Sequence, residues 1–392
     1  MYRTFLSIFI ILAATAALFA QSTAADLFDL GNAKMDRQDC VGAIADYTKA
    51  IDLDPRYSAA FNNRGICRES QQDLDGAIAD YTRAIELDPR FAEAFNNRGG
   101  LRNKRGDLDG AMADFTRAIE LNGKYALAYF NRGVVRFQKK DHDGAIGDYT
   151  RSLELDPRQR RAYFNRGFAR YLKEDQDGAV ADYTRAIEFD PGYVLAYSAR
   201  AAARTKKLDH YGAVADLTKA IELGDNDSYY PRAWSKFLLK DNDGAYQDVS
   251  TYLGIFGLRG VSPSYAAIVG YLSLRKAGKA AEAKSFMQNG FKQLDPAAWA
   301  TKILKYLNGE MTAAQLLALA TDDNKLTEAH GYIGEMLLIA GDRTNAATHF
   351  KWVRDRGVKT FNEFDLAVAE LRTLENAPSN VRVRPGRSGK PS

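Results

Sequence analysis

The chain carries charged residues that recur every 34 positions and could bind an ionic ligand. Arginines occur in pairs four residues apart, as at Arg64 and Arg68, and an aspartate such as Asp80 follows each pair. Because residues four apart share one helical face, we expect each pair to face the carboxylate of its own or the preceding repeat. The members of this ladder are Arg68, Arg102, Arg136, Arg170, Asp80, Asp114, Asp148 and Asp182.

The ladder has two interpretations, an anion-binding stripe or a stack of partly buried ion pairs. A buried charge without a partner costs several kcal/mol, so buried arginines would need carboxylates beside them. The acidic and basic residues appear together in the same repeats. We therefore favour the structural ion pairs.

A second recurring motif, Asp-x-Asp-Gly, resembles part of a calcium-binding loop, as in residues 73–76. Such a loop also needs an acidic ligand upstream and a glutamate after the glycine, but Gln71 and Thr82 occupy these positions. The motif stands where a second helix should begin. It therefore predicts helix N-caps rather than a calcium site.

Other signals of catalysis are missing from the sequence. Cys40 and Cys67 have no metal ligands at zinc spacing. No nucleophile motif or glycine-rich phosphate loop occurs. The histidines are scattered without partners, at His142, His210, His330 and His349. We expect no catalytic residue, no metal and no cofactor.

The elements that position these residues repeat with the same period. The segments Phe61–Arg90, Phe95–Lys124 and Tyr129–Arg158 are closely similar, and a fourth copy starts at Tyr163. This period is typical of helix-turn-helix solenoids. One helix pair cannot bury its apolar stripe alone, so the pairs must stack.

Small and aromatic residues hold fixed positions in each repeat, as at Gly65, Ala77, Tyr81, Ala84 and Pro89. On these positions the chain resembles the tetratricopeptide-repeat family. The resemblance implies an all-α fold, a right-handed superhelical solenoid of helix-turn-helix repeats with a C-terminal capping helix. Small residues let the two helices approach closely, and proline ends the second helix.

We expect seven repeats within residues 26–259, at about 24–57, 58–91, 92–125, 126–159, 160–193, 194–225 and 226–259. Residues 260–326 are interpreted as degenerate helical pairs, and residues 327–375 as a late repeat plus the capping helix. The C-terminal part is similar to a periplasmic tetratricopeptide lipoprotein that acts as an adaptor of cell-wall hydrolases.

The resemblance also implies where a ligand lies, because in this family the first helices line a concave groove. An apolar peptide would dock on its aromatic residues, and packing between repeats is the alternative role of these residues. The family also packs two positions held here by Cys40 and Cys67 against each other, as a disulfide or as two thiols. The matching groove positions are Asn62, Asn96, Asn103, Phe130, Phe137, Arg161, Phe164, Phe168 and Tyr171.

The two ends have different compositions from the body. Arg3, the apolar run from Phe5 to Ala20 and the small residues that follow predict a signal peptide at 1–25. Residues 376–392 are rich in Pro, Ser, Gly and Arg, which predicts a disordered basic tail. Without Arg3 and the four basic residues of the tail, the net charge of +4 becomes −1. The body therefore has no basic surface for nucleic acid.

These features predict an exported protein, periplasmic or secreted, that meets the membrane only through its signal peptide. We expect a non-catalytic scaffold that binds a protein or peptide on its concave face. Two alternatives are a protein that binds a glycan or cell-wall fragment and an accessory domain with a hydrolytic site in residues 260–326. The sequence does not define the oligomeric state.

Overall fold

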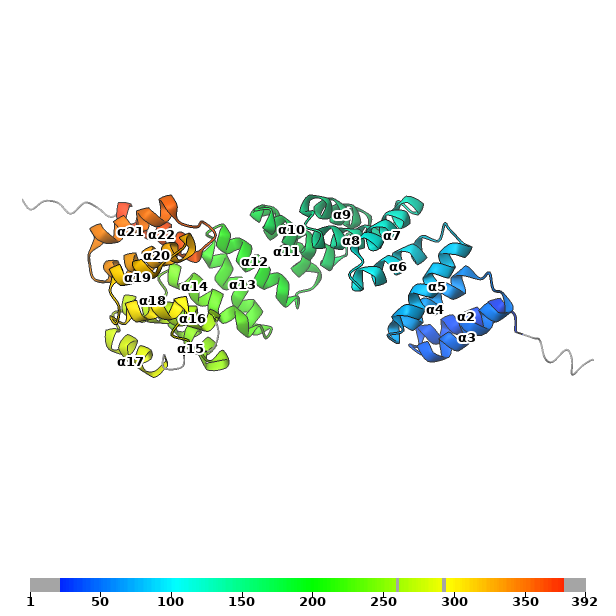
Figure 1. Ribbon diagram of the computed structural model, residues 1–392, viewed down its shortest axis with the longest axis horizontal. Helices are drawn as coiled ribbons and strands as arrows, with labels where there is room; N and C mark the ends of the chain where they lie inside the picture. Colours follow the sequence, from blue (N-terminus) through cyan, green and yellow to red (C-terminus); the bar gives the residue numbers. More distant parts are fainter. Residues whose placement is uncertain (1–21, 259–260, 291–293, 377–392) are drawn as a thin grey trace, which may run out of the picture. The chain divides into compact units, whose positions relative to one another are not determined.

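The computed structural model describes residues 22–258, 261–290 and 294–376 (Figure 1). These residues form α-helices and one short 3-10 helix, without a strand. The predicted all-helical architecture is therefore confirmed. The basic tail and most of the predicted signal peptide lie outside the described residues. The chain divides into two compact units, Met1–Phe189 (unit 1) and Asp190–Ser392 (unit 2).

The described part of unit 1 consists of helix pairs. The first helices are α2 (Ala24–Asp36), α4 (Ser58–Ser70), α6 (Ala92–Lys104), α8 (Ala126–Gln138) and α10 (Arg160–Leu172). The second helices are α3 (Cys40–Leu53), α5 (Leu74–Leu87), α7 (Leu108–Leu121), α9 (His142–Leu155) and α11 (Gln176–Phe189). From α3 to α9, each second helix packs on its own first helix and on the first helix of the next pair. This is the stacking that the repeat predicts.

Glycine sets the close approach of the two helices in each pair. A Cβ atom added to Gly65 would lie 2.7 Å from the ring of Tyr81, which is fully buried. Each equivalent glycine faces the equivalent ring in the same way, at Gly31, Gly99, Gly133 and Gly167. The glycine of the first helix and the aromatic residue of the second helix therefore pack directly against each other in each repeat.

Unit 2 begins with two pairs of the same kind, α12 (Val194–Lys206) with α13 (His210–Glu222), and α14 (Tyr229–Leu238) with α15 (Asn242–Phe256). A 3-10 helix at Asn226–Ser228 precedes α14. The helices α16 (Val261–Lys276), α17 (Ala280–Gly290), α18 (Trp299–Leu307) and α19 (Ala313–Leu319) follow. The last helices are α20 (Asp323–Ile339), α21 (Arg343–Arg356) and α22 (Asn362–Asn376).

Helix α22 stands where a capping helix was expected, and it packs on both α20 and α21 (Figure 1). It also contacts an earlier helix, since Glu370 of α22 forms an ion pair with Lys276 of α16, and Lys206 of α12 donates a hydrogen bond to the carbonyl of Thr360 just before α22. Its packed side buries Glu363 and Glu370 as well as Leu366 and Leu371. This helix therefore carries acidic residues into the interior of unit 2.

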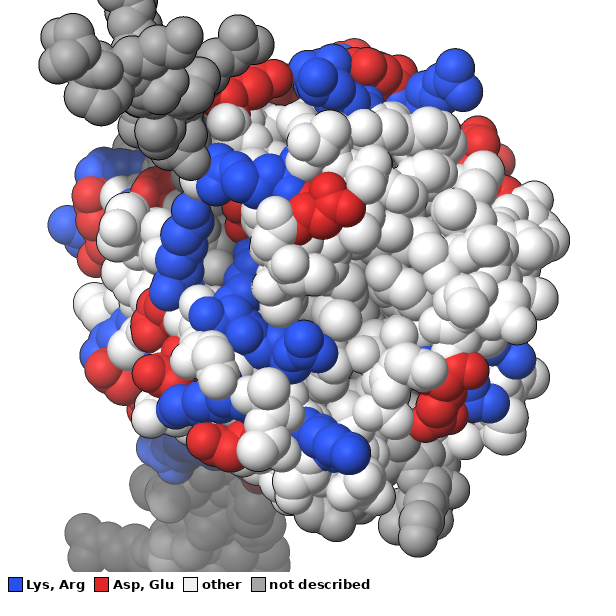
Figure 2. All heavy atoms as spheres, turned by 90° about the vertical axis from the view of Figure 1, so that its left-hand side faces the viewer, with Lys and Arg blue, Asp and Glu red and all other residues white. Residues whose placement is uncertain are grey.

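The surface of unit 2 mixes both signs of charge. In the view of Figure 2, lysines and arginines gather over one half of the face, with acidic side chains among them, and the other half is mainly uncharged. No described helix combines the length and apolar character that a membrane span needs.

Candidate functional site

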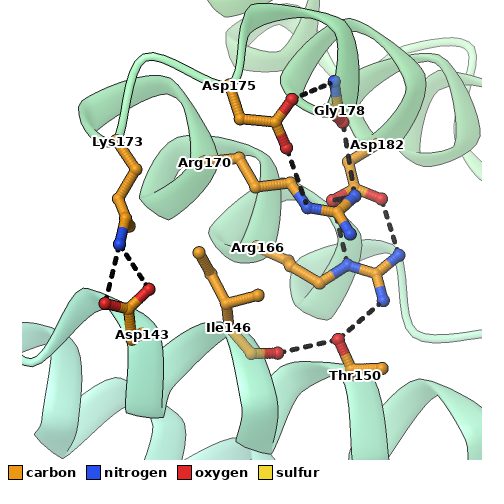
Figure 3. Close-up of polar contacts among 9 residues, drawn as sticks. All are labelled: Asp143, Ile146, Thr150, Arg166, Arg170, Lys173, Asp175, Gly178 and Asp182. Atoms are coloured by element: carbon orange, nitrogen blue, oxygen red, sulfur yellow. Dashed lines mark hydrogen bonds and ion pairs between the residues drawn. The ribbon is translucent and has the colours of Figure 1, made fainter.

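Each aspartate of the ladder binds two arginines of its own repeat. In the fifth pair, Arg166 donates two hydrogen bonds to Asp182, at 2.9 and 2.7 Å, and Arg170 donates one at 2.8 Å (Figure 3). Arg166 also donates to the hydroxyl of Thr150 in the preceding repeat, at 3.1 Å. Asp182 is 2% exposed. The carboxylate partner therefore lies in the same repeat, and a threonine provides the link between repeats.

The same geometry recurs along the chain. Arg64 and Arg68 bind Asp80, and the first arginine stacks on the ring of Phe61, 5.3 Å from its centroid. The hydrogen bonds that Arg132 donates to Asp148 raise the pKa of its guanidinium above the ordinary value. The remaining sets are Arg98/Arg102/Asp114, Arg132/Arg136/Asp148, Arg200/Arg204/Asp216 and Arg232/Lys236/Asp248. The arginines are thus occupied by internal carboxylates, which supports the structural interpretation over an anion stripe.

The Asp-x-Asp-Gly motif caps helices, as predicted. The side chain of Asp175 accepts a hydrogen bond from the backbone N–H of Gly178 at 2.9 Å (Figure 3). A Cβ atom at Gly178 would lie 2.2 Å from the same carboxylate, so a larger residue there would displace the Asp175 side chain from the position it takes here. The second aspartate of the preceding motif, Asp143, binds Lys173 of the next repeat at 2.5 Å. Among the described residues, no group of three acidic, histidine or cysteine side chains could hold a metal.

The asparagines assigned to the groove are mostly internal. Asn62 and Asn96 are each 4% exposed, and they accept hydrogen bonds from Asn97 and Asn131 of the following repeats, both at 3.0 Å. This corrects the prediction that they line a binding surface. Because each amide is buried, it needs a partner, and the next repeat supplies one. Asn103 is partly buried.

The aromatic groove residues divide into anchored and exposed ones. Phe130 packs on the buried ring of Tyr149 at 5.8 Å, and Phe164 packs equivalently on Tyr183 at 5.6 Å. Phe137 and Phe168 meet across neighbouring repeats with their ring centroids 5.5 Å apart. Phe168 is 40% exposed. Arg161 is exposed and Tyr171 half-buried.

Cys40 and Cys67 are free thiols that share one hydrophobic cluster with Tyr47. Burial, together with a hydrogen bond involving Cys40, raises the pKa of the Cys67 thiol to about 12. A thiol with so high a pKa is a poor nucleophile near neutral pH. The pair therefore acts as part of the core between the first two repeats.

Unit 2 contains a group of buried carboxylates that the sequence interpretation missed. Glu335 and Glu370 each lie 2.6 Å from the Nζ of Lys276, and their side chains are at most 9% exposed. Glu328 accepts hydrogen bonds from the Tyr265 hydroxyl at 2.7 Å and the Trp299 indole at 2.9 Å.

Glu363 completes this group by accepting a hydrogen bond from the hydroxyl of Tyr332. Burial raises its pKa, and burial together with the nearby Glu363 charge raises the pKa of Glu328 to about 8. A signal was present in the sequence. Helices α20 and α22 each carry two glutamates seven residues apart. This spacing places the two glutamates of a helix on one face, among apolar residues.

Two histidines also come together in unit 2, contrary to the expectation of partnerless histidines. The Nδ1 atoms of His330 and His349 are 2.9 Å apart, and His330 stacks on Trp352 with a centroid distance of 4.1 Å. Burial and the proximity of His349 lower the pKa of His330 to about 4. The pair is therefore neutral near pH 7, and one ring donates to the other.

A cavity of about 510 Å³ lies in the region proposed to hold a hydrolytic site. Its lining contains a single carboxylate, that of Glu310, together with Lys305, three uncharged polar residues and two apolar ones. Acid-base hydrolysis of the glycosidase type needs two carboxyl groups. This cavity therefore gives no support to a hydrolytic site.

Comparisons with known proteins agree with the repeat architecture. Models described as tetratricopeptide repeat match residues 28–90, 126–159 and 143–194, and one described as TPR repeat matches residues 99–140. No curated protein matches the chain.

Solved structures that resemble the chain include MamA, 30% identical, with 41% of this chain and 94% of that one aligned at a TM-score of 0.38. YrrB, described as a TPR protein with an unusual peptide-binding site, is 24% identical, with 45% and 92% covered and a TM-score of 0.42. The C-terminal part of a TPR repeat-containing protein from Cytophaga hutchinsonii is 17% identical, with 59% and 100% covered and a TM-score of 0.50.

The repeated glycine–aromatic contact and the family models thus point to one conclusion. The chain belongs to the tetratricopeptide-repeat family, whose stacked helix pairs serve as protein-interaction scaffolds.

Proposed function

We propose that the first helices of unit 1 bind a polypeptide segment of a partner protein, with Phe137 and Phe168 at the centre of the contact. The observation that carries this proposal is the meeting of two aromatic rings from neighbouring repeats, one of them 40% exposed. Exposed aromatic residues beside other apolar ones are favourable binding positions, because covering them removes apolar area from water.

The surroundings of this aromatic pair favour an apolar contact. The ladder arginines in the same helices are already bound to buried aspartates, so Arg136 and Arg170 offer little free positive charge. Arg161 of α10 is exposed. A partner segment with apolar side chains and a carboxylate for Arg161 fits this surface.

Substitutions at exposed positions test the proposal without disturbing the core. Phe168→Ala and Arg161→Ala change exposed side chains, whereas Phe130 and Phe164 support buried tyrosines and would report on stability as well. Val41→Ala is the control, since Val41 is 68% exposed on the second helix α3. Tagged full-length chains would be used to capture proteins from a cell extract, quantified by mass spectrometry.

We expect Phe168→Ala to reduce capture of specific partners at least about fivefold, consistent with loss of more than about 1 kcal/mol at a central aromatic residue. Val41→Ala should capture the same amount as wild type. Equal capture by Phe168→Ala and wild type, with both chains folded, would exclude this surface as the binding site.

We also propose that the protein is exported and that its signal peptide is cleaved after Ala20, within the segment 1–25 that the sequence predicts as the signal peptide. The composition of residues 1–20 supports export. The capping box of α2 supports this position, because Thr23 and Asp26 bind each other's backbone N–H groups. Cleavage after Ala24 or Ala25 would remove Thr23 and leave the helix uncapped. N-terminal sequencing of the mature chain tests the cleavage site, and cell fractionation tests export. A chain that starts at Met1 and stays in the cytoplasm would contradict both proposals.

A further inference from the structure

The four buried glutamates of unit 2 form two levels on two helices. Glu328 and Glu335 lie seven residues apart on α20, and Glu363 and Glu370 lie seven apart on α22. Seven residues make about two helical turns, so each helix presents two carboxylates on one face. All four residues are at most 7% exposed. Each of these carboxyl groups must therefore either keep a proton or have a cation beside it.

One level has its own cation. The Nζ of Lys276 lies 2.6 Å from both Glu335 and Glu370, and the lysine side chain is 15% exposed. The same ammonium group lies over the ring of Phe237, 4.8 Å from its centroid. In this level the fold thus neutralises a pair of buried glutamates with one primary ammonium group, which lies between the two carboxylates and beside an aromatic ring.

The other level lacks a cation. Among the described residues, no lysine or arginine lies within ion-pair distance of Glu328 or Glu363. The nearby Lys206 donates to the carbonyl of Thr360 instead. Both donors to Glu328, Tyr265 and Trp299, reach the same oxygen, Oε2, so no described residue donates to Oε1.

A cavity of about 280 Å³ opens at this second level. Both glutamates line it, and three aromatic side chains supply further walls. An ionised carboxylate with aromatic faces around it attracts cations, because both present negative potential, so an ammonium group in this cavity would replace the proton that Glu328 otherwise keeps. The remaining lining residues are Tyr230, Tyr265, Thr360, Phe361 and Asn362.

We propose that this cavity binds the primary ammonium group of a ligand between Glu328 and Glu363, as Lys276 lies between Glu335 and Glu370. The ligand is an alkylamine, either a free one or a lysine side chain of a polypeptide. The site lies in unit 2 and is independent of the partner-binding surface proposed in unit 1. The carboxylates are available because Tyr265 and Trp299 both donate to one oxygen of Glu328 and leave the other open, and Tyr332 donates to one oxygen of Glu363.

The test uses the indole N–H signal of Trp299, which reports directly on Glu328. Full-length protein labelled on tryptophan would be titrated with 1,5-diaminopentane and with N-acetyl-lysine methylamide, and separately with N-acetyl-norleucine methylamide, which lacks the ammonium. We expect saturable shifts with both amines at millimolar concentrations and none with the norleucine compound. Saturation by the free amine alone or by the lysine compound alone also supports the site and identifies the ligand source.

Variants separate binding from folding. Glu328→Gln and Glu363→Gln should weaken amine binding at least tenfold, whereas Glu310→Gln, in the other cavity of unit 2, should bind as wild type does. Asn362→Lys offers an internal ammonium at the cavity wall, and it should remove amine binding while leaving the fold intact. The proposal fails if the norleucine compound shifts the signal equally, if Asn362→Lys binds amines as wild type does, or if neither amine gives a saturable shift.

Discussion

Unit 1 and the last helices of unit 2 both bury carboxylates, but they compensate the charge in different ways. In unit 1 each buried aspartate binds basic side chains of its own repeat, as Asp182 binds Arg166 and Arg170, and Asp46 binds Lys34. In unit 2 the buried glutamates of α20 and α22 bind residues far along the chain, such as Lys276, Tyr265 and Trp299. The first arrangement is complete in every repeat, and the second leaves one pair without a cation.

The difference teaches that repetition favours self-contained ion pairs. A repeat that carries both partners can be duplicated without leaving a buried charge unpaired, whereas a pair formed by distant helices depends on one particular packing. The complete ladder therefore belongs to the scaffold. The incomplete glutamate pair is a better place for a ligand.

The largest effect in this comparison should come from Asp182→Ala. The change leaves two arginines in a largely buried position without their carboxylate, which should lower the free energy of unfolding by about 3–5 kcal/mol. Asp143→Ala is the control, because it removes the exposed ion pair with Lys173 and should cost less than about 1 kcal/mol. Urea denaturation followed by circular dichroism measures both. Similar values for the two variants would mean that the ladder is not the stabilising element.

The next effect tests the glycine–aromatic contact of the repeats. Gly133→Ala places a methyl group 2.8 Å from the buried ring of Tyr149, so we expect a loss of about 1–3 kcal/mol through overpacking. Gly147→Ala, on the second helix of the same repeat, has no neighbour within 4 Å and should stabilise the helix by up to about 1 kcal/mol. Thermal denaturation of the two variants should therefore shift in opposite directions. A shift of both in the same direction would contradict the contact.

The repeated region was largely predictable from the sequence. The period of 34 residues predicted the helix pairs, and the joint recurrence of Arg and Asp predicted ion pairs. The spacing alone could not show whether an arginine pair binds the aspartate of its own repeat or the aspartate of the preceding repeat, because the two aspartates lie at equivalent positions. The asparagines were assigned wrongly, since the family groove positions of Asn62 and Asn96 are used here for hydrogen bonds between repeats.

The glutamate cluster could not be predicted in the same way. Glu328 meets Tyr265, 63 residues earlier in the chain, and no repeat pattern relates the two. The same holds for the contact of His330 with His349, which depends on the packing of α20 on α21. Glutamates seven residues apart in apolar helices indicate burial, but they do not identify the partners.

A smaller effect should come from the glutamate pair without a cation, Glu328 and Glu363, in the way the free energy of unfolding depends on pH. The pKa of Glu328 rises from 4.5 to about 8, through burial first and then the charge of Glu363, with Asp322 adding to the rise and Tyr265 and Trp299 opposing it. Between these two values the folded chain keeps a proton that the unfolded chain has lost. The free energy of unfolding therefore falls as pH rises from about 4.5 to 8.

Glu328→Gln removes this contribution while keeping an acceptor for Tyr265 and Trp299. We expect the variant to match wild type near pH 5 and to exceed it by about 1–2 kcal/mol near pH 9. Denaturation at several pH values measures the difference, and Glu310→Gln should follow the wild-type curve. A pH profile of Glu328→Gln parallel to wild type would show that Glu328 is already charged at neutral pH in the folded protein.

The smallest effect concerns a feature that both units share, the helix N-cap. Asp107 in unit 1 and Asp241 in unit 2 accept the same hydrogen bond from Gly110 and Gly244, at 2.9 and 3.0 Å. A cap depends only on its own helix, so Asp107→Ala and Asp241→Ala should each cost about 1 kcal/mol.

The second aspartates of the same two motifs provide the controls, because Asp109 and Asp243 bind exposed lysines of the next helix pair. Asp109→Ala and Asp243→Ala should cost less than about 0.5 kcal/mol, as exposed ion pairs usually do. Hydrogen exchange of the first-turn amides of α7 and α15 resolves these small differences helix by helix. Equal losses at Asp107 and Asp241 would show that capping depends only on the capped helix in both units. A clearly larger loss in one unit would mean that its cap also supports contacts beyond its own helix.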